Sequence, residues 1–114
     1  MPLDDLAKAL EELGYPVDRS LSEQGAVVLT GFRINAGRYT GATVDIGIPY
    51  ADFPFTPPAG VHIRPQLAPN GQNNINQSGL GADWQYWSRR LSAWSKDRTA
   101  RHIISYINKV FLDA

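Results

Sequence analysis

Apolar residues recur at helical spacing at the start of the chain. They fall at intervals of three and four residues, which places them on one face of an α-helix. These positions are Leu3, Leu6, Ala7, Leu10 and Leu13. Gly14 follows where a helix cap is expected, and Pro16 opposes further helix. The pattern therefore predicts a first helix that docks one apolar face on the rest of the domain.

Four segments in the middle of the chain have the patterns of β-strands. Residues 25–32 form an apolar run bounded by glycines. Residues 38–40 and 42–48 carry β-branched and aromatic side chains, and predict either two strand segments interrupted near Gly41 or one long bent strand. In residues 61–67 apolar and polar side chains alternate. Short glycine-containing connections favour an antiparallel meander of about four strands.

The C-terminal third begins with a polar stretch and continues with aromatic residues. Residues 68–83 are rich in Asn and Gly and predict a loop. Four large residues then recur at the spacing of one helical face, which predicts a helix with a buried aromatic stripe. They are Trp84, Trp87, Leu91 and Trp94.

A last helix is predicted after Trp94, with Ser95 or Asp97 as its N-cap. Its apolar stripe consists of Ala100, Ile103, Ile104, Ile107, Val110 and Phe111. The order of a helix, sequential strands and C-terminal helices is typical of an α+β fold. The length of 114 residues predicts one domain over residues 1–114.

Composition narrows the classes of function. The formal net charge is zero, so nothing favours binding to nucleic acid or to an anionic membrane. The absence of cysteine excludes disulfides, thiolate metal sites and thiol catalysis. No histidine-rich metal spacing or phosphate-binding glycine motif is found, so we expect no metal and no cofactor. Neither a signal peptide nor a membrane span is visible, which favours a cytoplasmic protein.

An aromatic and proline-rich element precedes the polar stretch. Residues 53–58 read Phe-Pro-Phe-Thr-Pro-Pro, and nine residues separate them from Ala68-Pro69-Asn70. Ser78 lies eight positions beyond Asn70. This arrangement resembles ubiquitin-conjugating enzymes, in which a Tyr-Pro-Phe-x-Pro-Pro element, a His-Pro-Asn turn and the catalytic cysteine follow at the same spacing. Trp94-Ser95 before the last helix is similar to the family's Trp-Ser-Pro segment, although the stretch from Ser78 to Trp94 is several residues longer than usual.

The resemblance implies a ubiquitin-conjugating-like fold over nearly the whole chain, closest to divergent prokaryotic branches. It puts Ser78 at the position of the nucleophile and Asn70 at that of the side chain that stabilises the oxyanion. Ala68 replaces the histidine that supports the turn in the family. The resemblance also implies a surface that contacts activating enzymes or ligases, although these side chains also have a packing role at the end of the sheet. That surface consists of Phe53, Phe55, Pro57 and Pro58.

Three functions remain open. The first is a non-catalytic adaptor that binds a ubiquitin-like protein, its activating enzyme or a deconjugating peptidase, as other variants of this family without a catalytic cysteine do. The second is an acyl carrier that forms an oxyester on Ser78, for which His62 is a candidate base because a serine hydroxyl requires activation. The third is an interaction module unrelated to ubiquitin. On either non-catalytic function, His62 is a polar residue on the less buried face of the sheet.

Overall fold

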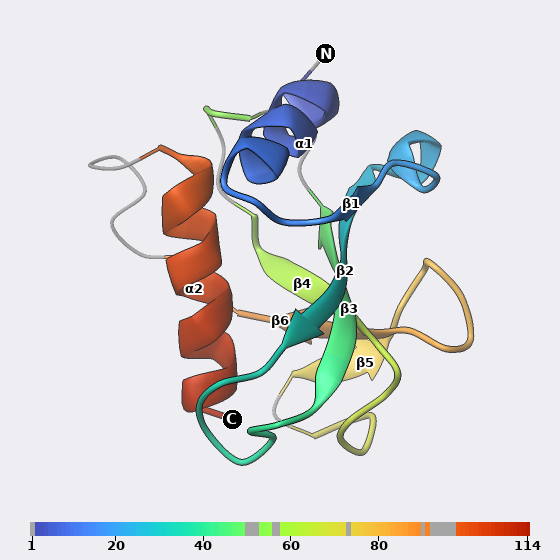
Figure 1. Cartoon of the computed structure of the whole chain (residues 1–114). Coiled ribbons are helices and arrows are strands. Elements are labelled where there is room, and N and C mark those ends of the chain that lie inside the picture. The colour runs from blue at the N-terminus through green and yellow to red at the C-terminus, as the bar shows by residue number, and fades with distance from the viewer. Residues whose placement is uncertain (1, 50–52, 56–57, 73, 90, 92–97) are drawn as a thin grey trace.

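The computed structural model describes residues 2–49, 53–55, 58–72, 74–89, 91 and 98–114, with side chains from Asp4 onward. Within these residues the chain begins with one α-helix and ends with another, and the β-strands lie between them in sequence (Figure 1). The elements are α1 (Pro2–Glu12), β1 (Val17–Asp18), the 3₁₀ helix η1 (Ser22–Gln24), β2 (Ala26–Arg33), β3 (Thr43–Pro49), β4 (Gly60–Arg64), β5 (Ile75–Gln77), β6 (Gln85–Ser88) and α2 (Ala100–Leu112).

The strands form a single antiparallel sheet in the order β1-β2-β3-β4-β6-β5. The first four strands are neighbours in chain order, so the predicted α+β class and antiparallel meander are confirmed. The described residues contain six strands where about four were expected. The last two exchange places, because β6 pairs with β4 and leaves β5 at the edge of the sheet.

Both helices pack against one face of the sheet, and the core lies between the helices and that face. Alternation along the strands brings one apolar set to this face. The largest fully buried side chains come from both layers and pack in one cluster, so the helices and the sheet share a core. They are Leu6, Leu10, Leu29, Ile34, Ile46, Ile48, Ile63, Trp87, Ile103, Ile107 and Phe111.

The two predicted apolar helices are confirmed, with a change at one cap. Gly14 follows α1 with φ of 93°, a conformation that suits glycine at a helix end. All six stripe residues predicted for the last helix are buried in α2. The predicted N-cap was wrong: the hydroxyl of Thr99 caps α2 by accepting the N–H of His102 at 3.3 Å. Ser95 and Asp97 lie outside the described residues.

The predicted aromatic helix was wrong, because Gln85–Ser88 is strand β6. The spacing of three residues between Trp84 and Trp87 fits a helix. Both side chains are buried, however, with Trp87 in strand β6 and Trp84 directly before it. Trp87 enters the core, and Trp84 lies beneath the guanidinium of Arg64, 4.5 Å from its carbon. Pairing with strands on both sides and the β propensity of the aromatic residues outweigh the helical spacing. Trp94 lies outside the described residues.

Two further strand predictions need correction. Residues 38–40 belong to a turn in which Thr40 N–H and its hydroxyl both bond to Gly37 O, so only the second of the two segments around Gly41 is a strand. Strand β4 ends at Arg64 rather than at Leu67. The predicted loop over 68–83 contains the short strand β5.

No helix among the described residues has both the length and the apolar character needed to cross a membrane.

Candidate functional site

His62 lies on the face of the sheet turned away from the helices. Register pairs it with Gly47 on β3 and with Tyr86 on β6, so the three residues form one row across the sheet. The rings of His62 and Tyr86 lie 4.8 Å apart between centroids. The imidazole is therefore half-buried between Gly47, which has no side chain, and the ring of Tyr86.

The segment that follows β5 folds over this row. A Cβ atom at Gly47 would lie 3.0 Å from Leu80 Cδ1 and 3.5 Å from Trp84 Cζ3. The absence of a side chain at Gly47 therefore provides the room in which Leu80 and Trp84 cover the outer face. The outer face near Gly47 is therefore partly covered, and His62 and Tyr86 stay half-buried.

Ser78 lies beneath this cover with 5% of its surface exposed. Its Oγ lies 2.6 Å from His62 Nδ1. The same oxygen accepts the backbone N–H of Leu80 at 3.0 Å. Since a hydroxyl has two lone pairs and one proton, Oγ can either donate to Nδ1 or accept from it, and the tautomer of His62 sets the direction.

The protonation state of His62 fits this arrangement. Burial lowers the pKa of His62 to about 4, so the imidazole is neutral at pH 7 and one of its nitrogens is an acceptor. In the neutral tautomer with its proton on Nε2, Nδ1 accepts the Ser78 hydroxyl; in the other tautomer, Nδ1–H donates to Oγ. The pair ties β4 to the end of β5 on a covered surface. The same contact also has the geometry of a hydroxyl and its general base.

A second polar cluster forms around Gln85, which is completely buried on β6. Its Oε1 accepts the backbone N–H of Leu67 at 3.0 Å and that of Ala68 at 3.4 Å. Its Nε2 donates to Ala68 O and, at 2.9 Å, to Asn70 Oδ1. One amide thus satisfies the polar groups of the turn at residues 67–70.

The structure does not bring Asn70 and Ser78 together. Asn70 bonds to Gln85, whose side chain lies on the helix-covered face of β6. Ser78 bonds to His62, which pairs with Tyr86 on the opposite face. Asn70 is therefore not positioned to donate to an oxyanion that would form at Ser78.

The aromatic and proline-rich element combines packing with exposure. Phe53 is half-buried against the core, and Pro58 is buried. Phe55 has 67% of its surface exposed, which is unusual for a side chain of this size. Pro57 lies outside the described residues. The element therefore anchors itself through its ends and presents one aromatic ring to solvent.

Sequence reasoning missed the role of Gln85 and the pairing of Asp45 with Arg64. Gln85 stands two positions before Trp87, and that spacing is the one sequence signal that a strand would bury both on the same face. Asp45 is half-buried; its carboxylate accepts Gly31 N–H at 3.0 Å and binds the Arg64 guanidinium at 2.7 Å. Both interactions depend on strand register, which the sequence pattern leaves open.

Within the described part of the chain, no group of three or more His, Cys, Asp or Glu residues could hold a metal ion. No protein-family model matches the chain, and no curated protein or solved structure is significantly similar to it.

Proposed function

We propose that this domain is a non-catalytic, ubiquitin-conjugating-like adaptor in a prokaryotic ubiquitin-like modification pathway. The observation that carries the proposal is the state of Ser78 at the nucleophile position. It is buried, and its hydroxyl is held between His62 Nδ1 and Leu80 N–H. A hydroxyl in this setting stabilises the fold and is poorly accessible to a macromolecular acyl donor.

The resemblance in sequence supplies the pathway, and the exposed ring of Phe55 supplies a contact surface. An exposed aromatic side chain on an anchored turn gives a large contact area with little loss of conformational entropy on binding. The partners that fit the resemblance are a ubiquitin-like protein, its activating enzyme or a deconjugating peptidase, in the cytoplasm. The strands β5 and β6 before the last helix depart from the pattern that the resemblance predicts.

The oxyester carrier is the second candidate, and the 2.6 Å contact between Ser78 Oγ and His62 Nδ1 favours it. On this alternative His62 removes the proton as Ser78 Oγ attacks the activated carboxyl carbon of the modifier; the bond from that carbon to the activating enzyme breaks, and the proton passes to the leaving group. Two observations weigh against it: Ser78 is buried, and Asn70 accepts a hydrogen bond from Gln85, whose side chain lies on the opposite face of the sheet. A pKa of about 4 also makes His62 a weak base at neutral pH.

The adaptor proposal is tested by binding. The purified domain is titrated calorimetrically with a ubiquitin-like protein, an activating enzyme and a deconjugating peptidase from one prokaryotic pathway, each alone. We expect binding to at least one of them, and a loss of affinity of about tenfold or more in Phe55→Ser, as for a contact residue at the centre of an interface.

Leu112→Ser is the matched control, because Leu112 is also a large exposed side chain, with 57% of its surface accessible. The control is expected to bind as the wild type does. Absence of binding to all three proteins, or equal losses in the two variants, would contradict the proposal.

A further inference from the structure

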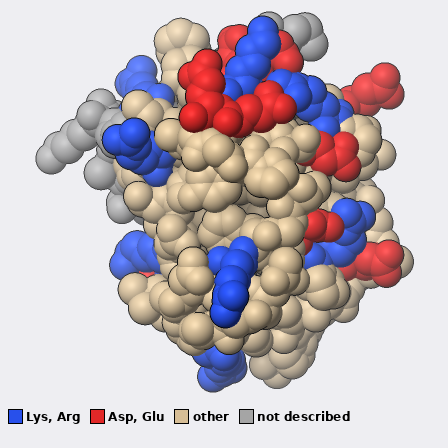
Figure 2. All heavy atoms as spheres, in the orientation of Figure 1, with Lys and Arg blue, Asp and Glu red and all other residues tan. Residues whose placement is uncertain are grey.

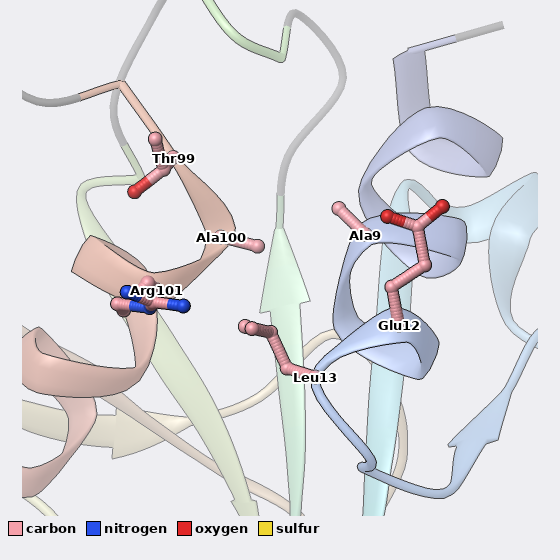
Figure 3. A pocket seen from close by; sticks show the side chains of 6 residues that line it. All are labelled: Ala9, Glu12, Leu13, Thr99, Ala100 and Arg101. Carbon is pink, nitrogen blue, oxygen red and sulfur yellow. The ribbon is translucent and has the colours of Figure 1, made fainter.

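A hollow of about 360 Å³ opens between the C-terminal end of α1 and the N-terminal end of α2. Figure 3 shows the side chains of Ala9, Leu13 and Ala100 pointing into the space between the helices. Two of these three side chains are alanines, and larger residues there would close the gap. Leu13 has 36% of its surface exposed and forms an apolar side of the hollow.

The two walls of this groove carry opposite charges. Glu12 belongs to the last turn of α1, and Arg101 belongs to the first turn of α2. The helix dipole favours neither charge, because the C-terminal end of a helix is partly negative and its N-terminal end is partly positive. A carboxylate on α1 and a guanidinium on α2 are thus each placed at the end of the helix that disfavours its charge.

No interaction within the described residues compensates for these placements. Glu11, the other acid in the last turn of α1, is paired with Arg19 at 2.7 Å. Glu12 and Arg101 have neither a hydrogen bond nor an ion pair among the described residues. Figure 2 shows acidic and basic side chains mixed on the surface near α1. Among the described residues these two charges have no partner and lie beside the apolar hollow, so a ligand in the hollow would meet both.

We propose that the groove binds a short peptide segment of a partner protein, in which a bulky apolar side chain lies between a basic and an acidic residue. The apolar side chain enters the hollow beside Ala9 and Leu13. The basic residue pairs with Glu12, and the acidic residue pairs with Arg101. Burial of the anchor gives affinity, and the two charges fix the orientation of the segment. This site is separate from the surface around Phe55 and does not depend on a ubiquitin-like partner.

The test uses random dodecapeptides displayed on phage, selected against the immobilised full chain. Enriched peptides are synthesised and their affinities measured by fluorescence polarisation. We expect them to share a large apolar residue flanked by Lys or Arg on one side and Asp or Glu on the other. Ala9→Leu, which fills the hollow, is expected to weaken binding by about tenfold or more. Leu112→Ser, at the opposite end of α2, is expected to leave it unchanged.

Two charge reversals separate recognition from folding. Glu12→Lys and Arg101→Glu each place a charge where the helix dipole favours it, so each is expected to keep or raise the thermal midpoint. Each is also expected to weaken binding of the selected peptides about tenfold. A structural role alone would not produce a more stable variant that binds less well.

Three results would overturn the proposal. The first is no enrichment above a surface without the protein, and the second is equal binding by the wild type and the Ala9→Leu and charge-reversed variants. The third is self-association of the wild type, seen by light scattering and abolished by Ala9→Leu, which would assign the groove to a second copy of the chain. The failure of any of these tests leaves the titrations with Phe55→Ser unaffected.

Discussion

At the scale of single residues, the imidazole of His62 couples stability to pH. Burial lowers its pKa in the folded state from 6.5 to about 4, so the unfolded chain takes up a proton at higher pH than the folded chain. Stability is therefore greatest above about pH 6.5 and falls as the pH drops from there toward 4. In His62→Gln, whose amide does not titrate, we expect a shallower fall in the urea-unfolding free energy between pH 7 and pH 5.

The carboxylates provide the internal reference for this comparison. Hydrogen bonds from Lys8 to Asp4 and from Arg19 to Glu11 lower the pKa values of these carboxyls. Their contribution to stability is lost as the pH falls through those lowered values, and it is the same in both proteins. Parallel stability curves for the wild type and His62→Gln would show that the buried imidazole of His62 does not set the pH dependence.

Spacing along the chain singled out Ser78 and Asn70, and His62 was a candidate base as one of two histidines, but the sequence could not assign them to faces. The position of a side chain above or below a sheet depends on strand register, and a shift of one residue reverses it. Asn70 is fixed by Gln85 on one side of β6, whereas Ser78 meets His62 on the other. Whether Ser78 faces Asn70 depends on the register of β5 and β6, two strands that periodicity did not reveal.

At the scale of elements, the turn after β2 packs against the C-terminal end of α2. Gly37 has φ of 83°, and a Cβ atom there would lie 2.0 Å from Phe111 O. Gly41, in the same turn, has φ of 94° with open space around the corresponding position. Substitutions at Gly41 and Gly37 therefore distinguish the cost of backbone strain alone from that of strain combined with a steric clash against α2.

We expect Gly41→Ala to lower the free energy of unfolding by about 1–2 kcal/mol, the cost of a left-handed conformation for alanine. Gly37→Ala should lower it by about 1–3 kcal/mol more, because the added methyl group also displaces the end of α2. Chemical denaturation of the two variants measures this difference. Equal losses would mean that the turn does not press on the helix.

The elements that could be predicted are those with long or strongly periodic patterns. The stripes of α1 and α2 and the apolar run of β2 each extend over enough residues to define their period. β6 has four residues and β5 has three, so their periods are ambiguous. These short strands exist because each completes the hydrogen bonding of a neighbour, and that is a tertiary effect.

At the scale of the whole molecule, element order and composition predicted one α+β domain with an antiparallel sheet. They did not predict how the chain after β4 returns across the sheet. This return places Leu80 and Trp84 over the outer face at Gly47 and buries Ser78. On the proposed function, Ser78 is a structural hydrogen-bonding residue on this buried face, and the domain is proposed to act by binding.

The most direct test of this claim is the intact mass of the protein after incubation with a ubiquitin-like protein, its activating enzyme and ATP. The wild type and Ser78→Ala are compared after the activating enzyme has been shown to carry the modifier. We predict that neither protein gains mass. A hydroxylamine-sensitive increase equal to one modifier in the wild type, absent from Ser78→Ala, would establish an oxyester on Ser78 and contradict the adaptor.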